Sequence, residues 1–84
     1  MNEINQRKHG IDFIDVPSMF DFPMVVFLDQ RQRYGEDRWI GIGWLGDILA
    51  VVVFIEYDTS MVRIISARKA TRNERQIYRE EIGH

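Results

Sequence analysis

The stretch RWIGIGWLGDILAVVVFIEYDTSMVRIISAR, residues 38–68, decides the fold. It contains three segments rich in Val, Ile and aromatic residues, and short turn sequences of Gly, Asp, Thr and Ser separate them. Connections this short join antiparallel strands, because a parallel return needs a crossover of about a dozen residues or more. The stretch therefore predicts a meander of strands at 38–44, 48–57 and 61–68.

The last of these strands should place alternate side chains on opposite faces of the sheet. Each face then mixes polar and apolar residues, so both are expected to be partly covered. Strict alternation predicts Val62, Ile64, Ser66 and Arg68 on one face and Arg63, Ile65 and Ala67 on the other.

Upstream of the meander, the sequence predicts two short helices. Residues 2–9 are polar and helix-compatible, and Gly10 is suited to a left-handed helix end. A second helix over 16–21 would be capped by an aspartate and would keep Pro17 in its first turn. The capping candidates are Asp12 and Asp15, the side chains expected to point inward are Met19 and Phe20, and a further β-rich segment follows at 24–28.

Downstream, Thr71-Arg72-Asn73-Glu74 matches the capping box, in which the threonine hydroxyl and the glutamate carboxylate each bind a backbone N–H of the first turn. A helix over 72–82 is expected to follow. The whole chain, residues 1–84, is thus predicted to be one α+β domain: two short N-terminal helices, an antiparallel meander of three to four strands and a C-terminal helix.

The composition excludes several classes of protein. The 84 residues are 45% hydrophobic and 29% charged, which is the profile of a chain that folds. Without cysteine there is no disulfide framework, thiolate metal site or cysteine nucleophile, and two histidines are too few for a histidine metal cluster. We therefore expect neither a metal nor a cofactor. The longest apolar run, 48–55, has strand length, so we expect no membrane association and a cytoplasmic protein.

The net charge of -2 conceals an uneven distribution. Residues 1–62 hold five basic and ten acidic side chains, whereas 63–84 hold six basic and three acidic ones. A local basic site for a polyanion is therefore expected at the C-terminal end.

The segment RIISARKATRNE, residues 63–74, is the strongest candidate for that site. It runs from a strand directly into a capped helix, where an arginine and the helix N-terminus can bind the same phosphate. Metal-free RNA cleavage also needs a base for the 2′-hydroxyl and an acid for the leaving oxygen, and His9, Glu74 and Tyr78 have suitable groups. On composition alone, a solvated helix face at Arg72, Arg75 and Arg79 with Glu74 acting only as a cap is the favoured alternative.

Other candidates carry less specific signals. His9 lies beside two cations at an expected helix end, where a histidine taken alone is more often structural or exposed than catalytic. Arg38 either points to a site or pairs with Glu36 or Asp37 at the surface. The aromatic side chains Trp39, Trp44, Phe54 and Tyr57 either stack on bases or fill the core.

Four ordered blocks, taken together, resemble the BrnT toxin family. They are RKHGIDF (7–13), FDFP (20–23), EDRWIGIG (36–43) and RIISARKATRNE (63–74), with Tyr78 following. The resemblance implies a RelE-like fold and a toxin of a type II toxin–antitoxin system that cleaves messenger RNA without a metal. It also implies a BrnA-like antitoxin that neutralises the toxin. The resemblance further implies that this antitoxin binds operator DNA and that the toxin contacts the DNA only through it. A catalytically inactive domain that binds antitoxin or nucleic acid is the alternative.

The resemblance also designates site residues and shows one departure. Members of the family usually begin with a short strand, and this chain is expected to lack it, which would leave a sheet edge open to homodimerisation or to the antitoxin. The residues expected to act in catalysis are His9, Arg38, Arg68, Glu74 and Tyr78, and those expected to bind RNA phosphates are Lys8, Arg63, Lys69 and Arg72.

Overall fold

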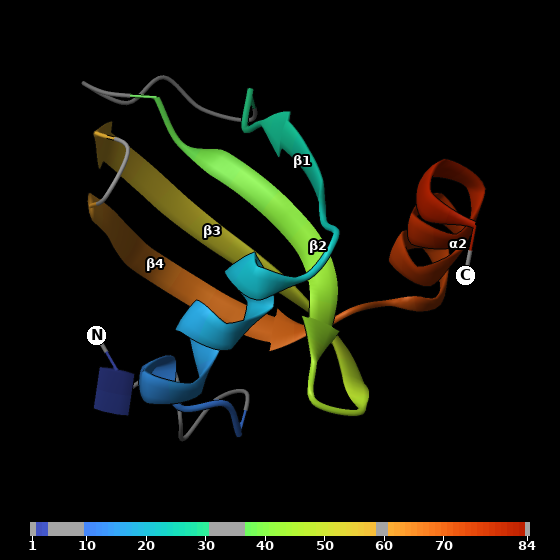
Figure 1. Cartoon of the computed structure of the whole chain (residues 1–84), viewed down its shortest axis with the longest axis horizontal. Helices are drawn as coiled ribbons and strands as arrows, with labels where there is room; N and C mark the ends of the chain where they lie inside the picture. The colour runs from blue at the N-terminus through green and yellow to red at the C-terminus, as the bar shows by residue number, and fades with distance from the viewer. Residues whose placement is uncertain (1, 4–9, 31–36, 59–60, 84) are drawn as a thin grey trace.

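A four-stranded antiparallel sheet forms the centre of the molecule (Figure 1). The structure is a computed structural model that describes residues 2–3, 10–30, 37–58 and 61–83. The strands follow the order β1-β2-β3-β4, so each pairs with its neighbour in sequence and the predicted meander is confirmed. Their bounds are β1 Val25–Leu28, β2 Trp39–Leu45, β3 Ile48–Asp58 and β4 Met61–Lys69.

The turn between β2 and β3 explains the tight reversal of the chain. It consists of Gly46 and Asp47, and Gly46 has a φ of +62°, which a residue without a Cβ adopts at little cost. The predicted turn after β3 includes residues 59 and 60, which lie outside the described residues.

The N-terminal region differs from the expectation of two short helices. Beyond the helical residues 2–3, its described part forms one 3-10 helix, η1, at Phe13–Asp21, and residues 4–9 of the first expected helix lie outside the described residues. Asp12 is the N-cap and accepts a hydrogen bond from the backbone N–H of Ile14. Because η1 begins earlier than expected, Pro17 lies inside it and removes one backbone donor, which is compatible with a short 3-10 segment and not with a continuing α-helix.

The sheet carries a separate apolar cluster on each face. On one face η1 packs Val16 and Met19, both fully buried, against the sheet. On the other face the C-terminal helix, α2 (Arg72–Ile82), packs Tyr78 against the sheet. The η1 cluster also contains Ile11, Ala50, Val52, Phe54 and Ala67, and the α2 cluster contains Ile42, Leu49 and Val51.

A β-bulge in β4 changes which residues share a face. Val53 pairs with Ser66 and the next residue, Phe54, pairs with Ile64, so Ile65 is an extra residue in the ladder. Strict alternation was therefore wrong for this strand. Val62 and Ile64 lie on the η1 face with Ala67, whereas Arg63 and Ser66 lie on the α2 face with Arg68.

The C-terminal helix has the predicted bounds and the predicted cap. The Thr71 hydroxyl accepts from the backbone N–H of Glu74, and the Glu74 carboxylate accepts from the backbone N–H of Thr71. Gly83 ends the helix with a φ of +95°. None of the helices in the described ranges is long and apolar enough to cross a membrane.

Candidate functional site

The junction between β4 and α2 brings several of the predicted site residues together. Lys69 ends β4, and Ala70 continues the sheet by donating its backbone N–H to the carbonyl of Leu49 at 2.9 Å. Thr71 then caps α2. Since only two residues separate strand from helix, the side chains of the strand end lie beside the first turn of α2, where unpaired backbone N–H groups concentrate positive potential.

Arg68 and Glu74 form a two-pronged ion pair across this junction. Nη1 and Nη2 of Arg68 each donate to one carboxylate oxygen of Glu74 at 2.7 Å. Nη1 also donates to the backbone carbonyl of Lys69 at 3.2 Å. Two parallel bonds fix both the position and the plane of the guanidinium, so Arg68 is oriented by the same carboxylate that caps the helix.

The ionisation of Glu74 follows from these contacts. The hydrogen bonds from Arg68 lower the pKa of the Glu74 carboxyl from 4.5 to about 2, and the bonds from Thr71 act in the same direction while burial opposes them. Glu74 is therefore a carboxylate at neutral pH and a weak base. In this arrangement its chemistry suits holding Arg68 better than moving a proton.

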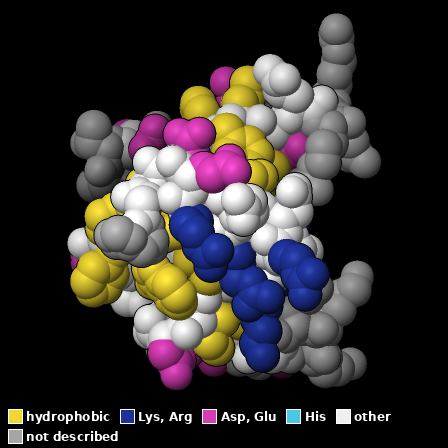
Figure 2. Space-filling model, turned by 90° about the vertical axis from the view of Figure 1, so that its right-hand side faces the viewer, with side chains coloured by type: hydrophobic (Ala, Val, Ile, Leu, Met, Phe, Trp, Pro, Cys, Tyr) yellow, Lys and Arg dark blue, Asp and Glu magenta, His cyan; other side chains and the backbone are white. Residues whose placement is uncertain are grey.

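Basic side chains continue from the junction along α2. Arg72, Arg75 and Arg79 recur at spacings of three and four residues, so they lie along one side of the helix, and all three are exposed. Within the described ranges, no ion pair joins any of them to an acidic side chain. Seen from the side that carries α2, Lys and Arg side chains form a continuous band (Figure 2).

A hollow of about 300 Å³ adjoins the start of α2 and contains both cationic and aromatic groups. Trp44 of β2 lines it together with Lys69, Arg75 and the acidic Asp47 of the turn between β2 and β3. Trp44 is 39% exposed, and its ring meets the ring of Tyr78 edge to face with centroids 6.3 Å apart. An oriented and accessible indole beside two cations is a surface on which an unpaired base can stack while its phosphates are neutralised.

Tyr78 lies in the core below this surface. It is 4% exposed, and its hydroxyl donates to the backbone carbonyl of Pro23 at 3.1 Å. That bond ties α2 to the segment before β1. The position gives Tyr78 a clear part in packing and no direct access to an RNA base.

The other predicted arginines lie further along the sheet. Arg63 is exposed and pairs with Ile55 on the α2 face, and Arg38 immediately precedes β2 next to the Trp39–Phe54 pair. Arg68 pairs with Val51, four residues from Ile55 along β3, which corresponds to about 13 Å at the usual strand rise. The structure therefore brings Arg68, Lys69, Arg72 and Glu74 together and places Arg38 and Arg63 apart from them.

Lys8 and His9 lie outside the described residues, so their predicted roles remain predictions. In the part of the chain that the structure describes, no group of three or more His, Cys, Asp or Glu side chains is placed to hold a metal ion. Sequence reasoning named Trp44 only as one of four aromatic candidates. Its position opposite Leu49, one residue from the turn, is the signal that distinguishes it, because strand ends leave side chains accessible.

One of two comparisons with known proteins agrees with the resemblance. A search of curated proteins found no match. The family model described as "Ribonuclease toxin, BrnT, of type II toxin-antitoxin system" matches residues 1–74, which include the ion pair and the helix cap. With 74 of 84 residues matched, the chain belongs to the BrnT family of ribonuclease toxins of type II toxin–antitoxin systems.

Proposed function

We propose that this chain cleaves messenger RNA without a metal ion, arrests growth by doing so, and is neutralised by a BrnA-like antitoxin. The observation that carries the proposal is a group of cations at the β4–α2 junction and along α2, with Trp44 beside two of them. This group, called the basic band below, consists of Arg68, Lys69, Arg72, Arg75 and Arg79. Operator DNA is contacted only through the antitoxin. The family supports a ribonuclease toxin with a protein partner, and the remaining details are the proposal.

The reaction is a transfer of the phosphoryl group within the RNA. The 2′-oxygen attacks the adjacent phosphorus and loses its proton to a base, the bond to the 5′-oxygen of the next nucleotide breaks, and an acid supplies a proton to that oxygen. Negative charge builds up on the phosphate oxygens during this step, and fixed cations stabilise it. Arg68 is the residue proposed for this task, since Glu74 holds its guanidinium in one orientation.

The neighbouring groups have separate proposed roles. Lys69 and Arg72 bind phosphates next to the scissile bond, as does Lys8, and Arg63 and Arg38 bind phosphates of more distant nucleotides because both lie away from Arg68. Proton transfer is assigned to His9, since Glu74 has a pKa of about 2 and Tyr78 is buried. Glu74 and Tyr78 then support catalysis as positioning residues.

The test measures cleavage by purified protein. A synthetic single-stranded RNA is incubated with the chain in EDTA, and the rate is compared with those of Arg68→Ala, Arg68→Lys and the control Glu81→Ala, an exposed residue of α2. We expect cleavage in EDTA and a loss of about 100-fold in rate for Arg68→Ala, the usual size for one transition-state donor. Lysine should restore only part of the rate because it cannot form the two-pronged contact.

Two results would contradict the proposal. A rate in Arg68→Ala equal to that of the wild type would remove Arg68 from the site. Intact RNA under every condition, together with salt-dependent RNA binding, would identify the chain as an inactive binding domain.

A further inference from the structure

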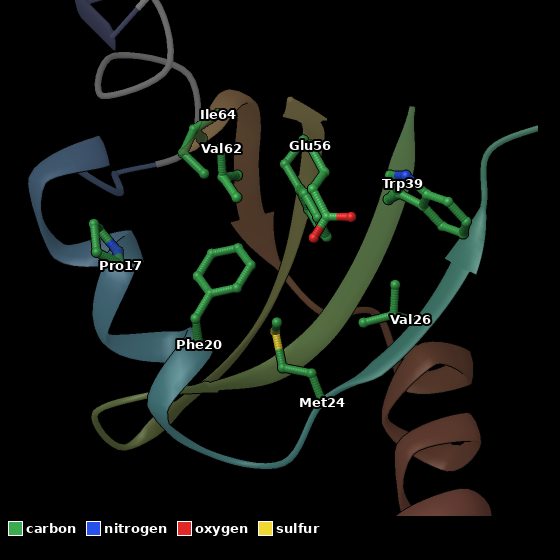
Figure 3. A pocket seen from close by; sticks show the side chains of 9 residues that line it. Pro17, Phe20, Met24, Val26, Trp39, Glu56, Val62 and Ile64 are labelled. Atoms are coloured by element: carbon green, nitrogen blue, oxygen red, sulfur yellow. The ribbon is translucent and has the colours of Figure 1, made fainter. Parts of the chain in front are cut away.

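The η1 face of the sheet contains an apolar groove that the described part of the chain does not fill (Figure 3). Its volume is about 630 Å³. The helix η1 covers the end of the sheet at Ala50, Val52 and Ala67, and the groove lies where that cover stops. Its lining comes from η1, the segment after it and all four strands: Pro17, Phe20, Met24, Val26, Trp39, Phe54, Glu56, Val62 and Ile64.

Several of the lining side chains are unusually accessible for their type. Phe20 is 38% exposed, Val26 45% and Val62 37%, although all three point toward the same groove. The Phe20 ring is held edge to face against Phe54, with centroids 5.2 Å apart. Apolar side chains exposed side by side in one groove favour contact with another apolar surface, since such a contact removes them from water.

The dimensions of the groove fit one α-helix. It crosses four strands, which at the usual spacing of about 4.8 Å gives a length of about 14 Å. Two turns of α-helix span about 11 Å and a helix is about 10 Å wide, so residues at positions i, i+3, i+4 and i+7 would reach along it. η1 would lie along one side of such a helix.

The charges around the groove indicate which charge its partner carries. Among the described residues, Glu56 is the one charged side chain in the lining, and Figure 3 shows its carboxylate directed into the groove. Residues 10–30, which form η1 and β1, contain four aspartates and no Lys or Arg. Among them, Asp15 and Asp21 are exposed on η1. This face therefore attracts a cationic partner, whereas the α2 face attracts an anionic one.

We propose that the groove binds an amphipathic helix of the antitoxin, with apolar side chains on the sheet and a Lys or Arg paired with Glu56. This rests on the proposed function, which supplies a neutralising protein partner. The docking site lies on the opposite face of the sheet from the basic band, so the anchor of the antitoxin and the RNA site are separate surfaces.

Matched substitutions test the assignment. The protein encoded by the gene next to that of this chain is the probe, and its affinity is measured by calorimetric titration. Val26→Arg and Glu56→Arg alter the groove. Phe27→Arg is the control for the first, because Phe27 is the next residue of β1, is 41% exposed and lies outside the groove lining. Glu81→Arg is the control for the second, on the exposed surface of α2.

We expect each groove variant to lose at least about tenfold in affinity while each control stays within about twofold, because few interface residues carry most of the binding energy. In a Trp44→Phe variant, which leaves Trp39 as the one tryptophan, binding should shift the emission to shorter wavelength as Trp39 loses water. The free Val26→Arg and Glu56→Arg variants should cleave RNA at the wild-type rate.

If the neighbouring protein binds, three results would still overturn the inference: unchanged affinity in both groove variants, unchanged Trp39 emission on binding, or a homodimer of the free chain that only the groove variants dissociate. The last would assign the groove to a second copy. Failure of the neighbouring protein to bind would also overturn it. RNA cleavage by the wild-type chain in any of these cases would leave the proposed ribonuclease activity standing.

Discussion

At the scale of single residues, the position of Trp44 determines how it can contribute. Trp44 is held by Tyr78 below it and remains accessible beside Lys69 and Arg75. We expect Trp44→Ala to weaken binding of single-stranded RNA by about 1–3 kcal/mol, the usual contribution of one stacked base. Fluorescence anisotropy with a labelled oligonucleotide measures it. Tyr57→Ala, at another accessible aromatic residue, is the control, and an equal loss in both variants would refute stacking on Trp44.

The lowered pKa of Glu74 leads to a second prediction at this scale, which concerns how the stability of the protein depends on pH. The folded pKa of about 2 is below the ordinary value of 4.5, so the Glu74 contacts stabilise the protein above about pH 4.5 and lose that contribution as the pH falls toward 2. Denaturant unfolding of the wild type and Glu74→Gln should therefore differ most near neutral pH, with the difference shrinking below about pH 4. A difference that stays constant down to about pH 3 would contradict the assignment.

Individual residues also show where sequence reasoning succeeds. The roles of Thr71 and Glu74 in the cap could be predicted because the capping box is a local pattern of four residues. The ion pair between Arg68 and Glu74 could not, since the two residues belong to a strand and a helix and only the fold brings their side chains together. Arg38 was expected to act in catalysis together with Arg68, and only the register of the strands shows that the two residues lie apart.

At the scale of elements, the contact between β2 and the segment before β1 depends on glycine. A Cβ added to Gly43 would lie 2.6 Å from Cγ of Met24, whereas one added to Gly41 would meet its nearest atoms at 3.3 Å. We expect Gly43→Ala to lower the free energy of unfolding by about 1–3 kcal/mol, as overpacking usually does, and Gly41→Ala to cost less. Denaturant unfolding monitored by circular dichroism gives both values. Equal stability of Gly43→Ala and wild type would show that Met24 moves aside at no cost.

The elements themselves were predictable to different degrees. Hydrophobic segments and short turns determine the strands, and the ends of β2, β3, β4 and α2 lie within one residue of the expected positions where the structure describes them. The type of η1 was not predictable in the same way, because an aspartate cap followed by proline is compatible with either an α- or a 3-10 helix. The bulge in β4 has no local sequence signal and depends on packing across the sheet.

At the scale of the whole molecule, the two faces of the sheet differ in charge. The net charge of -2 predicts weak attraction to RNA, but the basic residues gather at the β4–α2 junction and along α2. If Arg68, Lys69, Arg72 and Arg75 neutralise about four phosphates, the logarithm of the RNA affinity should fall against the logarithm of salt concentration with a slope of about -3. Titrations at several salt concentrations measure the slope, and a value near zero would exclude binding through this band.

The antiparallel meander could be predicted from the order of hydrophobic segments and short turns, and the basic C-terminal end from the distribution of charged residues. The groove could not, because its lining comes from η1, the segment after it and four strands, and its existence depends on where η1 stops. Sequence patterns show which residues are apolar and not which of them a short helix leaves uncovered.

The bulge at Ile65 gives β4 one residue more than its ladder with β3 requires. The strand therefore has a spare residue: a deletion of Ile65 would leave the pairs Phe54–Ile64 and Val53–Ser66 adjacent and every other partner unchanged. The regular part of β3, between Ala50 and Val53, has no extra residue. A deletion there would shift the register of the strand pairs on one side of the deleted position. Related chains of slightly different length can thus keep Arg63 and Arg68 on one face, provided that the change in length falls at the bulge.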